Sequence, residues 1–206
     1  GRKGFVMLKL LVVEDHAMVR EGLLKAVKRV EPGVTPLGAA DAAAALELLA
    51  DDDDVDLVLL DLMLPGTSGM ALLGVMRRRF PTIPVVILSA LDDVDTINRA
   101  LRQGAAGFIP KSSSTENMLA ALREVLAGGV YVPPRLRDLV ERQQARGRTV
   151  AERYGLTAGQ WRVLELLTQG KTNRQIAEML DVTEGTVKIH VSAIFKAMKV
   201  TNRTQA

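Results

Sequence analysis

Short apolar runs alternate with segments of helical periodicity along the first 127 residues of the chain. The run at 8–13 is apolar except for Lys9, and the next segment places apolar residues at the spacing of an amphipathic helix. The expected strands are 8–13, 34–39, 55–60, 85–88 and 107–109, and the expected helices are 18–30, 42–50, 70–79, 93–103 and 115–127. Because apolar strands that alternate with helices are covered on both faces, this pattern predicts an α/β fold with a doubly wound, five-stranded parallel sheet.

The pattern changes after Gly128-Gly129, where Pro133-Pro134 follow and the next residues are basic with little apolar periodicity. We interpret 129–154 as a linker, with a short helix at 136–144. Only helical patterns follow the linker, which predicts a small all-α second domain. The expected boundaries are therefore 7–128 for the first domain, 129–154 for the linker and 155–206 for the second domain.

The second domain opens two of its helices with capping boxes. In Thr157-x-x-Gln160 and Thr172-x-x-Gln175, the hydroxyl and the amide satisfy free backbone donors at a helix start. Thr183 is a natural N-cap for a third helix, whose apolar stripe is Val187, Val191, Ile194 and Met198. Two short helices, a tight turn and a longer helix indicate a helix-turn-helix. The second helix of such a unit enters the major groove of DNA, and here it is the helix capped by Thr183. The polar face of that helix carries Glu184, Lys188, His190 and Ser192.

Composition narrows the class of protein. Apolar residues make up 48% of the chain and charged residues 25%, as in soluble globular proteins, and there is no cysteine for disulfides or thiolate metal sites. No apolar run reaches the roughly 18–20 residues of a membrane span, and we see no secretory signal. We therefore expect a cytoplasmic protein without a membrane partner. We also expect Met7 to be the native start, with the six residues before it a cloning remnant or an alternative start.

The charge is distributed unevenly along the chain. Residues 1–127 hold 14 basic and 17 acidic side chains, residues 128–148 hold 5 and 2, and residues 149–206 hold 8 and 5. An acidic front and a basic back suggest that the second domain meets a polyanion, although surpluses of this size are common on ordinary surfaces.

Acidic side chains gather at the predicted ends of two strands. Glu14 and Asp15 end the first strand and Asp61 ends the third, and a doubly wound sheet brings such ends together. Clustered carboxylates repel one another without a cation, and hard oxygen ligands suit Mg²⁺. Ser89 closes the fourth strand and Lys111 follows the fifth, and a hydroxyl and an ammonium there can hold phosphoryl oxygens. Each residue alone is an ordinary helix cap or surface side chain, but together they indicate a phosphoryl-binding site.

Four stretches of the first domain resemble the receiver domain of response regulators, and the resemblance extends over residues 8–127. They are LLVVEDH, LVLLDLMLPGTSG, VVILSA and GFIPK. The resemblance implies the flavodoxin-like strand order 2-1-3-4-5 and makes Asp61 the phospho-acceptor for a cognate sensor histidine kinase. It implies that Mg²⁺ is bound directly by Asp15, through water by Glu14, and by the backbone carbonyl of Met63.

The same resemblance assigns a switch to the first domain. Ser89 would report phosphorylation through its hydroxyl, Lys111 would contact the phosphoryl group, and Phe108 would be the aromatic switch residue. Phe108 also remains open to reading as a plain core aromatic residue. Pro110 matches a proline next to the lysine whose peptide bond is commonly cis in the family. We further hypothesise that the unphosphorylated receiver masks the recognition helix.

Residues 156–206 are similar to the LuxR-type output domain of the NarL/FixJ class. The spacing that carries this likeness is Gly170, Asn173, Ile176-Ala177, Leu180, Thr186-Val187-Lys188 and His190. The resemblance places the recognition helix at 186–198 and implies that it acts on double-stranded promoter DNA. The residues it assigns to DNA binding are Asn173, Thr186, Val187, Lys188 and His190. It also implies a homodimer on DNA when phosphorylated, although the fourth helix that relatives use to dimerise would be truncated here.

Two other functions stay open at this point. Haloacid-dehalogenase-like phosphatases also form an aspartyl phosphate with Mg²⁺. Their aspartates lie in a DxD motif on the first strand, whereas Asp61 ends the third strand. The helical domain could alternatively bind protein or RNA. His16 next to Asp15 could be a metal ligand, but no partner histidine lies nearby in the sequence. The interpretation that fits most residues is a phosphorylation-controlled transcription regulator that is not an enzyme.

Overall fold

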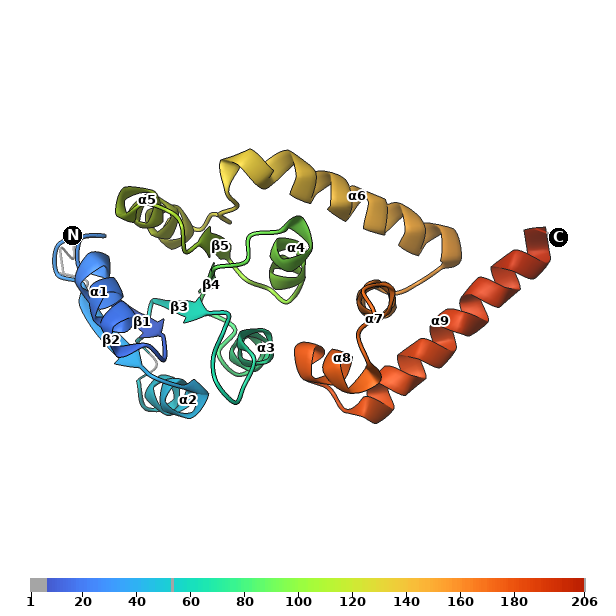
Figure 1. Ribbon diagram of the computed structural model, residues 1–206, viewed down its shortest axis with the longest axis horizontal. Coiled ribbons are helices and arrows are strands. Elements are labelled where there is room, and N and C mark those ends of the chain that lie inside the picture. The colour runs from blue at the N-terminus through green and yellow to red at the C-terminus, as the bar shows by residue number, and fades with distance from the viewer. Residues whose placement is uncertain (1–6, 53, 206) are drawn as a thin grey trace, which may run out of the picture. The chain divides into compact units, whose positions relative to one another are not determined.

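The computed structural model describes residues 7–52 and 54–205 and divides into two compact units, with the boundary between Arg137 and Asp138 (Figure 1). The first six residues, for which a non-native origin is expected, lie outside this range.

The first unit contains the predicted parallel sheet, with its strands in the order β2-β1-β3-β4-β5. The strands are β1 (Lys9–Val13), β2 (Thr35–Ala39), β3 (Leu57–Asp61), β4 (Val85–Ser89) and β5 (Gly107–Pro110). The helices are α1 (Ala17–Val27), α2 (Ala42–Asp51), α3 (Gly69–Arg79), α4 (Val94–Arg102) and α5 (Thr115–Leu126). The fold class and the strand order are thus confirmed, and each element overlaps its predicted range.

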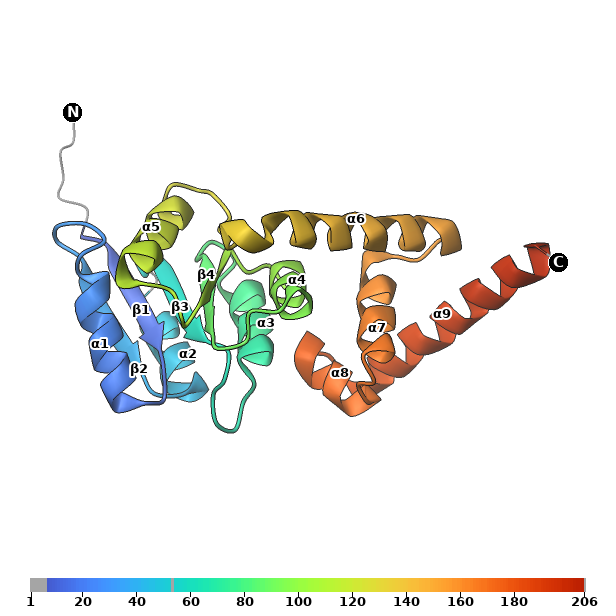
Figure 2. The same cartoon turned by 45° about the horizontal axis from the view of Figure 1, so that its top comes forward.

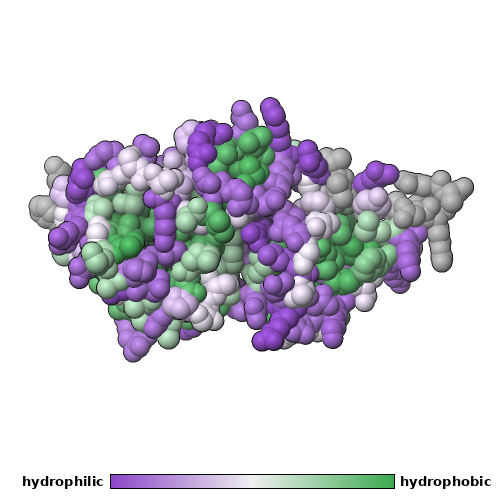
Figure 3. Space-filling view, viewed as in Figure 1, coloured by the Kyte–Doolittle hydropathy of each residue, from purple (hydrophilic) through white to green (hydrophobic). Residues whose placement is uncertain are grey.

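Helices cover both faces of this sheet, with α1 and α5 on one side and α2, α3 and α4 on the other (Figures 1 and 2). All five residues of β3 and of β4 are buried, which is why their sequences are apolar up to the last position. Most apolar side chains lie inside, and the face shown in Figure 3 carries separate apolar areas among hydrophilic residues. The two central strands are therefore buried over their whole length, including the polar residues Asp61 and Ser89 at their ends.

The second unit is helical and contains most of α6 (Arg137–Tyr154), then α7 (Ala158–Thr168), α8 (Asn173–Leu180) and α9 (Glu184–Gln205). Both predicted capping boxes are present, at the starts of α7 and α8. The amide of Thr186 donates to the Thr183 hydroxyl at 3.1 Å, so Thr183 caps α9 as predicted. A compact core joins the last three helices, with the buried residues Leu156, Val163, Leu166, Ile176, Ala177, Val187 and Ile194.

The helix α6 is longer than the sequence predicted. We expected a short helix at 136–144 in a linker, whereas α6 runs over 18 residues to Tyr154. Ala151 and Tyr154 pack against the helical core, and Gly147 lies under the indole of Trp161. Tertiary packing on its C-terminal half therefore stabilises a helix whose own apolar periodicity is weak.

Two further expectations are wrong. The helix α9 continues without a break to Gln205, so no separate fourth helix begins among the described residues. Residues 199–205 contain neither glycine nor proline that would end the helix. The expected cis bond at Pro110 is also absent, because the described residues contain no cis peptide bond and Pro110 continues the extended strand β5.

Candidate phosphorylation site and nucleic-acid interface

The C-terminal ends of β1, β3, β4 and β5 are neighbours and bring the predicted site residues to one edge of the sheet. The residues there are Glu14 and Asp15 after β1, Asp61 at the end of β3, Ser89 at the end of β4 and Lys111 after β5. This arrangement follows from parallel pairing, since all five strands point the same way.

The three carboxylates of this edge form a compact cluster. Glu14, Asp15 and Asp61 each offer an oxygen, and these oxygens all lie within 4.8 Å of one another. Glu14 and Asp61 are each only 2% exposed, whereas Asp15 is exposed. Hard oxygen donors at this separation suit a divalent cation with remaining positions open to water. The cluster could therefore hold a metal ion.

Lys111 is the cation that faces the buried carboxylates. Its Nζ lies 2.8 Å from Oδ2 of Asp61 and 3.5 Å from Oε2 of Glu14. The other Asp61 oxygen, Oδ1, accepts the backbone N–H of Met63 at 3.0 Å. Met63 itself is 63% exposed. Each carboxylate oxygen of Asp61 thus has its own hydrogen-bond donor.

The environment shifts the pKa values of the two buried acids in opposite directions. Burial raises the pKa of Glu14 to about 7, and the neighbouring Asp61 adds to the rise. Burial acts in the same direction on Asp61, but hydrogen bonds from Glu14, Lys111 and the Met63 amide hold its pKa below the usual value. Asp61 is therefore ionised at neutral pH, as a nucleophile requires, while Glu14, with a pKa of about 7, is only partly ionised.

Ser89 and Phe108 are both completely buried. The Ser89 hydroxyl oxygen accepts the backbone N–H of Leu91 at 3.0 Å, and the Ser89 carbonyl accepts the N–H of Lys111 at 2.7 Å. Ser89 therefore connects the loop after β4 to the lysine that holds Asp61. Phe108 fills the interior of the unit from β5.

Two positioning residues were not identified from the sequence. Arg20 donates to the Glu14 carbonyl at 2.8 Å and anchors the end of β1. A Cβ on Gly69 would lie 2.5 Å from the Leu62 carbonyl oxygen and 2.8 Å from that of Asp61, so only glycine lets α3 start against this backbone. Gly69 belongs to the quoted stretch that includes Asp61, but a single glycine there gives no local sign of a close approach.

The predicted DNA residues of the second unit lie on two helices. Asn173 is the first residue of α8, while Thr186, Lys188 and His190 lie in the first half of α9. Lys188 is exposed, and Asn173, Thr186 and His190 are partly exposed. Val187 is fully buried in the helical core, so its side chain supports α9 and does not face solvent.

Ile189 was not identified from the sequence as a candidate DNA contact. It is 71% exposed on α9, next to Lys188. An exposed aliphatic side chain on a recognition helix can contact a thymine methyl group. The absence of a charge made it indistinguishable from a core residue in the sequence.

Among the described residues, no helix is both long and apolar enough to span a membrane.

Comparisons with known proteins identify both units. The family described as response regulator receiver domain matches residues 10–123, and the family of bacterial regulatory proteins of the luxR type matches residues 155–206. A glycerol metabolism activator from Pseudomonas putida is 42% identical, over 97% of this chain and 93% of the relative. The nitrate/nitrite response regulator NarL from Escherichia coli is 33% identical, over 96% of this chain and 92% of NarL.

Solved structures are similar as well. A LuxR family DNA-binding response regulator from Silicibacter pomeroyi superposes with a TM-score of 0.55 at 31% identity, covering 62% of this chain and 98% of that one. RcsB from Salmonella enterica serovar Typhimurium, solved on promoter DNA with a phosphomimetic, superposes with a TM-score of 0.60 at 21% identity. The second match covers 93% of this chain and 92% of RcsB, and it bears on the fold alone.

Proposed function

Because the chain belongs to the response regulators that join a receiver domain to a LuxR-type DNA-binding domain, we propose that a sensor histidine kinase phosphorylates Asp61 and that phosphorylation controls DNA binding. Proteins of this family are DNA-binding transcription regulators and not enzymes. The observation that carries the proposal is the contact between Lys111 Nζ and Asp61 Oδ2, at 2.8 Å inside a cluster of three carboxylates.

The chemistry proposed for Asp61 is a phosphoryl transfer. An Asp61 carboxylate oxygen forms a bond to phosphorus while the bond from phosphorus to the donor's histidine nitrogen breaks, and the imidazole leaves. Lys111 then pairs with a phosphoryl oxygen, and Ser89 turns its hydroxyl to donate to another. Such transfers depend mainly on positioning and on neutralising charge, which these side chains provide.

Mg²⁺ is the cofactor that the carboxylate cluster fits best. Asp15, Asp61 and the carbonyl of Met63 would bind it directly and Glu14 through water. When bound, it would neutralise charge on the phosphoryl oxygens. The fit rests on the donor set, since Glu14, Asp15 and Asp61 each offer one hard oxygen ligand and these three oxygens lie within 4.8 Å of one another.

The output side of the proposal is a DNA contact through α8 and α9. Lys188 and His190 would reach base edges or phosphates, while Asn173 and Thr186, near helix N-termini, would contact phosphates. We expect the phosphorylated protein to bind promoter DNA as a homodimer and to act in the cytoplasm, where its kinase and DNA are accessible.

The proposal is tested with the full chain and DNA selected from random duplexes with and without acetyl phosphate and Mg²⁺. Affinity for the selected duplex, measured by fluorescence anisotropy, should rise about fivefold or more on phosphorylation. Asp61→Asn should abolish the rise, while the control Asp54→Asn, at an exposed carboxylate away from the cluster, should preserve it. A full gain of affinity in Asp61→Asn would contradict the proposal.

A further inference from the structure

The segment that leaves the first unit, residues 130–136, is called the connector here. It is attached to the edge of the sheet and does not run free. Tyr131 forms a parallel bridge with Gly107 of β5. The Tyr131 amide donates to the Ala106 carbonyl at 3.0 Å, and the Phe108 amide donates to the Tyr131 carbonyl at 3.0 Å. Val132 is 8% exposed. The connector thus adds a partial sixth strand, which pairs with Gly107 and accepts a hydrogen bond from the backbone of the expected switch residue Phe108.

A glycine permits this attachment. A Cβ on Gly107 would lie 3.3 Å from Tyr131 Cβ and 3.3 Å from a Val125 methyl carbon, which is closer than ordinary contact. Tyr131 also packs against the hydrophobic core between the sheet, α1 and α5. The connector is therefore held by side-chain packing as well as by two backbone hydrogen bonds.

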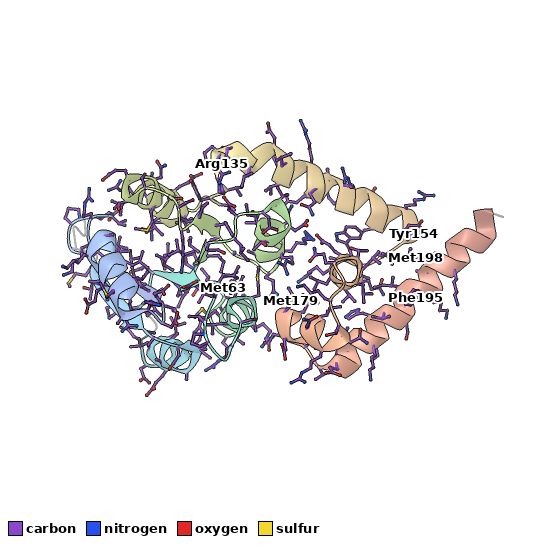
Figure 4. The ribbon with its side chains drawn as sticks, in the orientation of Figure 1. Met63, Arg135, Tyr154, Met179, Phe195 and Met198 are labelled. Carbon is purple, nitrogen blue, oxygen red and sulfur yellow. The ribbon has the colours of Figure 1, made fainter. Side chains whose placement is uncertain are left out.

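A second attachment links the connector to the loop after β4. Arg135 forms an ion pair with Asp92, and their side chains are 62% and 39% exposed; Figure 4 shows Arg135 where the chain leads into α6. Asp92 follows Leu91, whose amide donates to the Ser89 hydroxyl at 3.0 Å. Both residues expected to respond to phosphorylation are therefore linked to the connector. Phe108 donates a hydrogen bond to it directly, whereas Ser89 is linked to it through the loop that carries Leu91 and Asp92.

We propose that the connector is a latch, docked on β5 in the unphosphorylated receiver and loosened when Asp61 is phosphorylated. This inference rests on the proposed function. If the Ser89 hydroxyl turns to a phosphoryl oxygen, the Leu91 amide loses its acceptor and the loop that carries Asp92 shifts away from Arg135. A shift of Phe108 strains the hydrogen bond to Tyr131 at the same time. The latch is a two-state element next to the site that biases it.

The latch predicts a local change in hydrogen exchange of the full chain. With acetyl phosphate and Mg²⁺, the amides of Phe108 and Tyr131 should exchange about fivefold faster or more, the lower end of typical coupling between sites. The control amide is Thr35, which donates to the Leu8 carbonyl at 2.7 Å on the opposite edge of the sheet and should not change.

Single substitutions separate the latch from general loosening. Without phosphodonor, Arg135→Ala and Asp92→Ala should each speed exchange at Tyr131 by up to about fivefold, as expected for an exposed ion pair. The double variant should match the single ones, because both remove the same contact. The matched control is Arg29→Ala, which breaks an exposed arginine–carboxylate pair with Glu116 at 2.7 Å on another part of the unit.

The outcomes distinguish the latch from the function on which it rests. If intact-mass measurement of the same samples shows a phosphoryl group and exchange at Phe108 and Tyr131 stays unchanged or slows, the latch is wrong and the proposed function stands. Equal effects of Arg29→Ala and Arg135→Ala would also overturn the latch. If no phosphoryl group is acquired, both the proposed function and the latch fail.

Discussion

Replacing Gly69 by alanine tests how the start of α3 positions the proposed phospho-acceptor. The added Cβ would lie 2.5 Å from the Leu62 carbonyl oxygen, 2.6 Å from Leu62 Cα and 2.8 Å from the Asp61 carbonyl oxygen. All three are backbone atoms and cannot rotate away. Either α3 or the backbone that follows Asp61 must move by on the order of 1 Å to reach ordinary contact distances of about 3.5–4 Å.

The expected cost of Gly69→Ala combines opposing contributions. Overpacking costs about 1–3 kcal/mol. Loss of the hydrogen bond that the Gly69 amide donates to the Leu62 carbonyl, 3.0 Å long, costs about 1 kcal/mol more. Alanine recovers up to about 1 kcal/mol through its helix propensity. We therefore expect a net loss of about 1–3 kcal/mol in the free energy of unfolding. A shift of Asp61 by about 1 Å would also slow phosphorylation, by up to about 100-fold.

Two assays check this prediction. Urea unfolding gives the change in stability, and mass spectrometry of the chain with acetyl phosphate and Mg²⁺ gives the rate of phosphorylation. The control is Gly22→Ala in α1, where nothing lies within 4 Å of the added Cβ and a gain of about 0.5–1 kcal/mol is expected. Wild-type stability and a wild-type phosphorylation rate in Gly69→Ala would refute the steric argument.

Three further predictions address other parts of the molecule. Gly147→Ala would place a Cβ 2.6 Å from Nε1 of Trp161, and overpacking of about 1–3 kcal/mol outweighs the gain of up to about 1 kcal/mol in helix propensity, so unfolding of the helical unit, followed by tryptophan fluorescence, should show a net loss of up to about 2 kcal/mol; a gain in stability would contradict the packing of α6. Since the pKa of Glu14 is raised to about 7, a proton competes with the cation for this carboxylate, and Mg²⁺ affinity should be highest at about pH 8 and fall as the pH drops through 7; calorimetry that finds a constant affinity from about pH 8 to 6 would refute this. Lys188→Ala should weaken DNA binding and, if the lysine meets a phosphate, reduce the salt slope by about one; unchanged affinity and slope would remove Lys188 from the interface.

The sheet and the acidic cluster were predictable because their signals are local. Runs such as β3 and β4 are buried at every position, and a polar residue at the end of such a run stands out. Parallel pairing then decides which strand ends meet, so Asp61 and Lys111 could be expected together although they are 50 residues apart. The capping boxes of α7 and α8 are equally local, since each involves residues only three positions apart.

The features that sequence reasoning missed depend on contacts between distant segments. The length of α6 depends on packing such as that of Gly147 against Trp161, and the attachment of Tyr131 depends on the edge of β5. The close contacts of Gly147 with Trp161 and of Gly107 with Tyr131 have no local signature, because in the sequence a glycine that permits a close approach looks like any other glycine. Val187 shows a different limit, because it belongs to the motif assigned to DNA binding but is buried in the helical core. A motif does not distinguish a residue that packs inside the domain from one that faces DNA.

The most direct test of the central claim is peptide mass spectrometry of the full chain after incubation with acetyl phosphate and Mg²⁺. The account predicts that one phosphoryl group is acquired, that it lies on the peptide containing Asp61, and that removal of Mg²⁺ with a chelator prevents it. A phosphoryl group on a different residue, or an unmodified Asp61 peptide in a folded protein, would contradict the account.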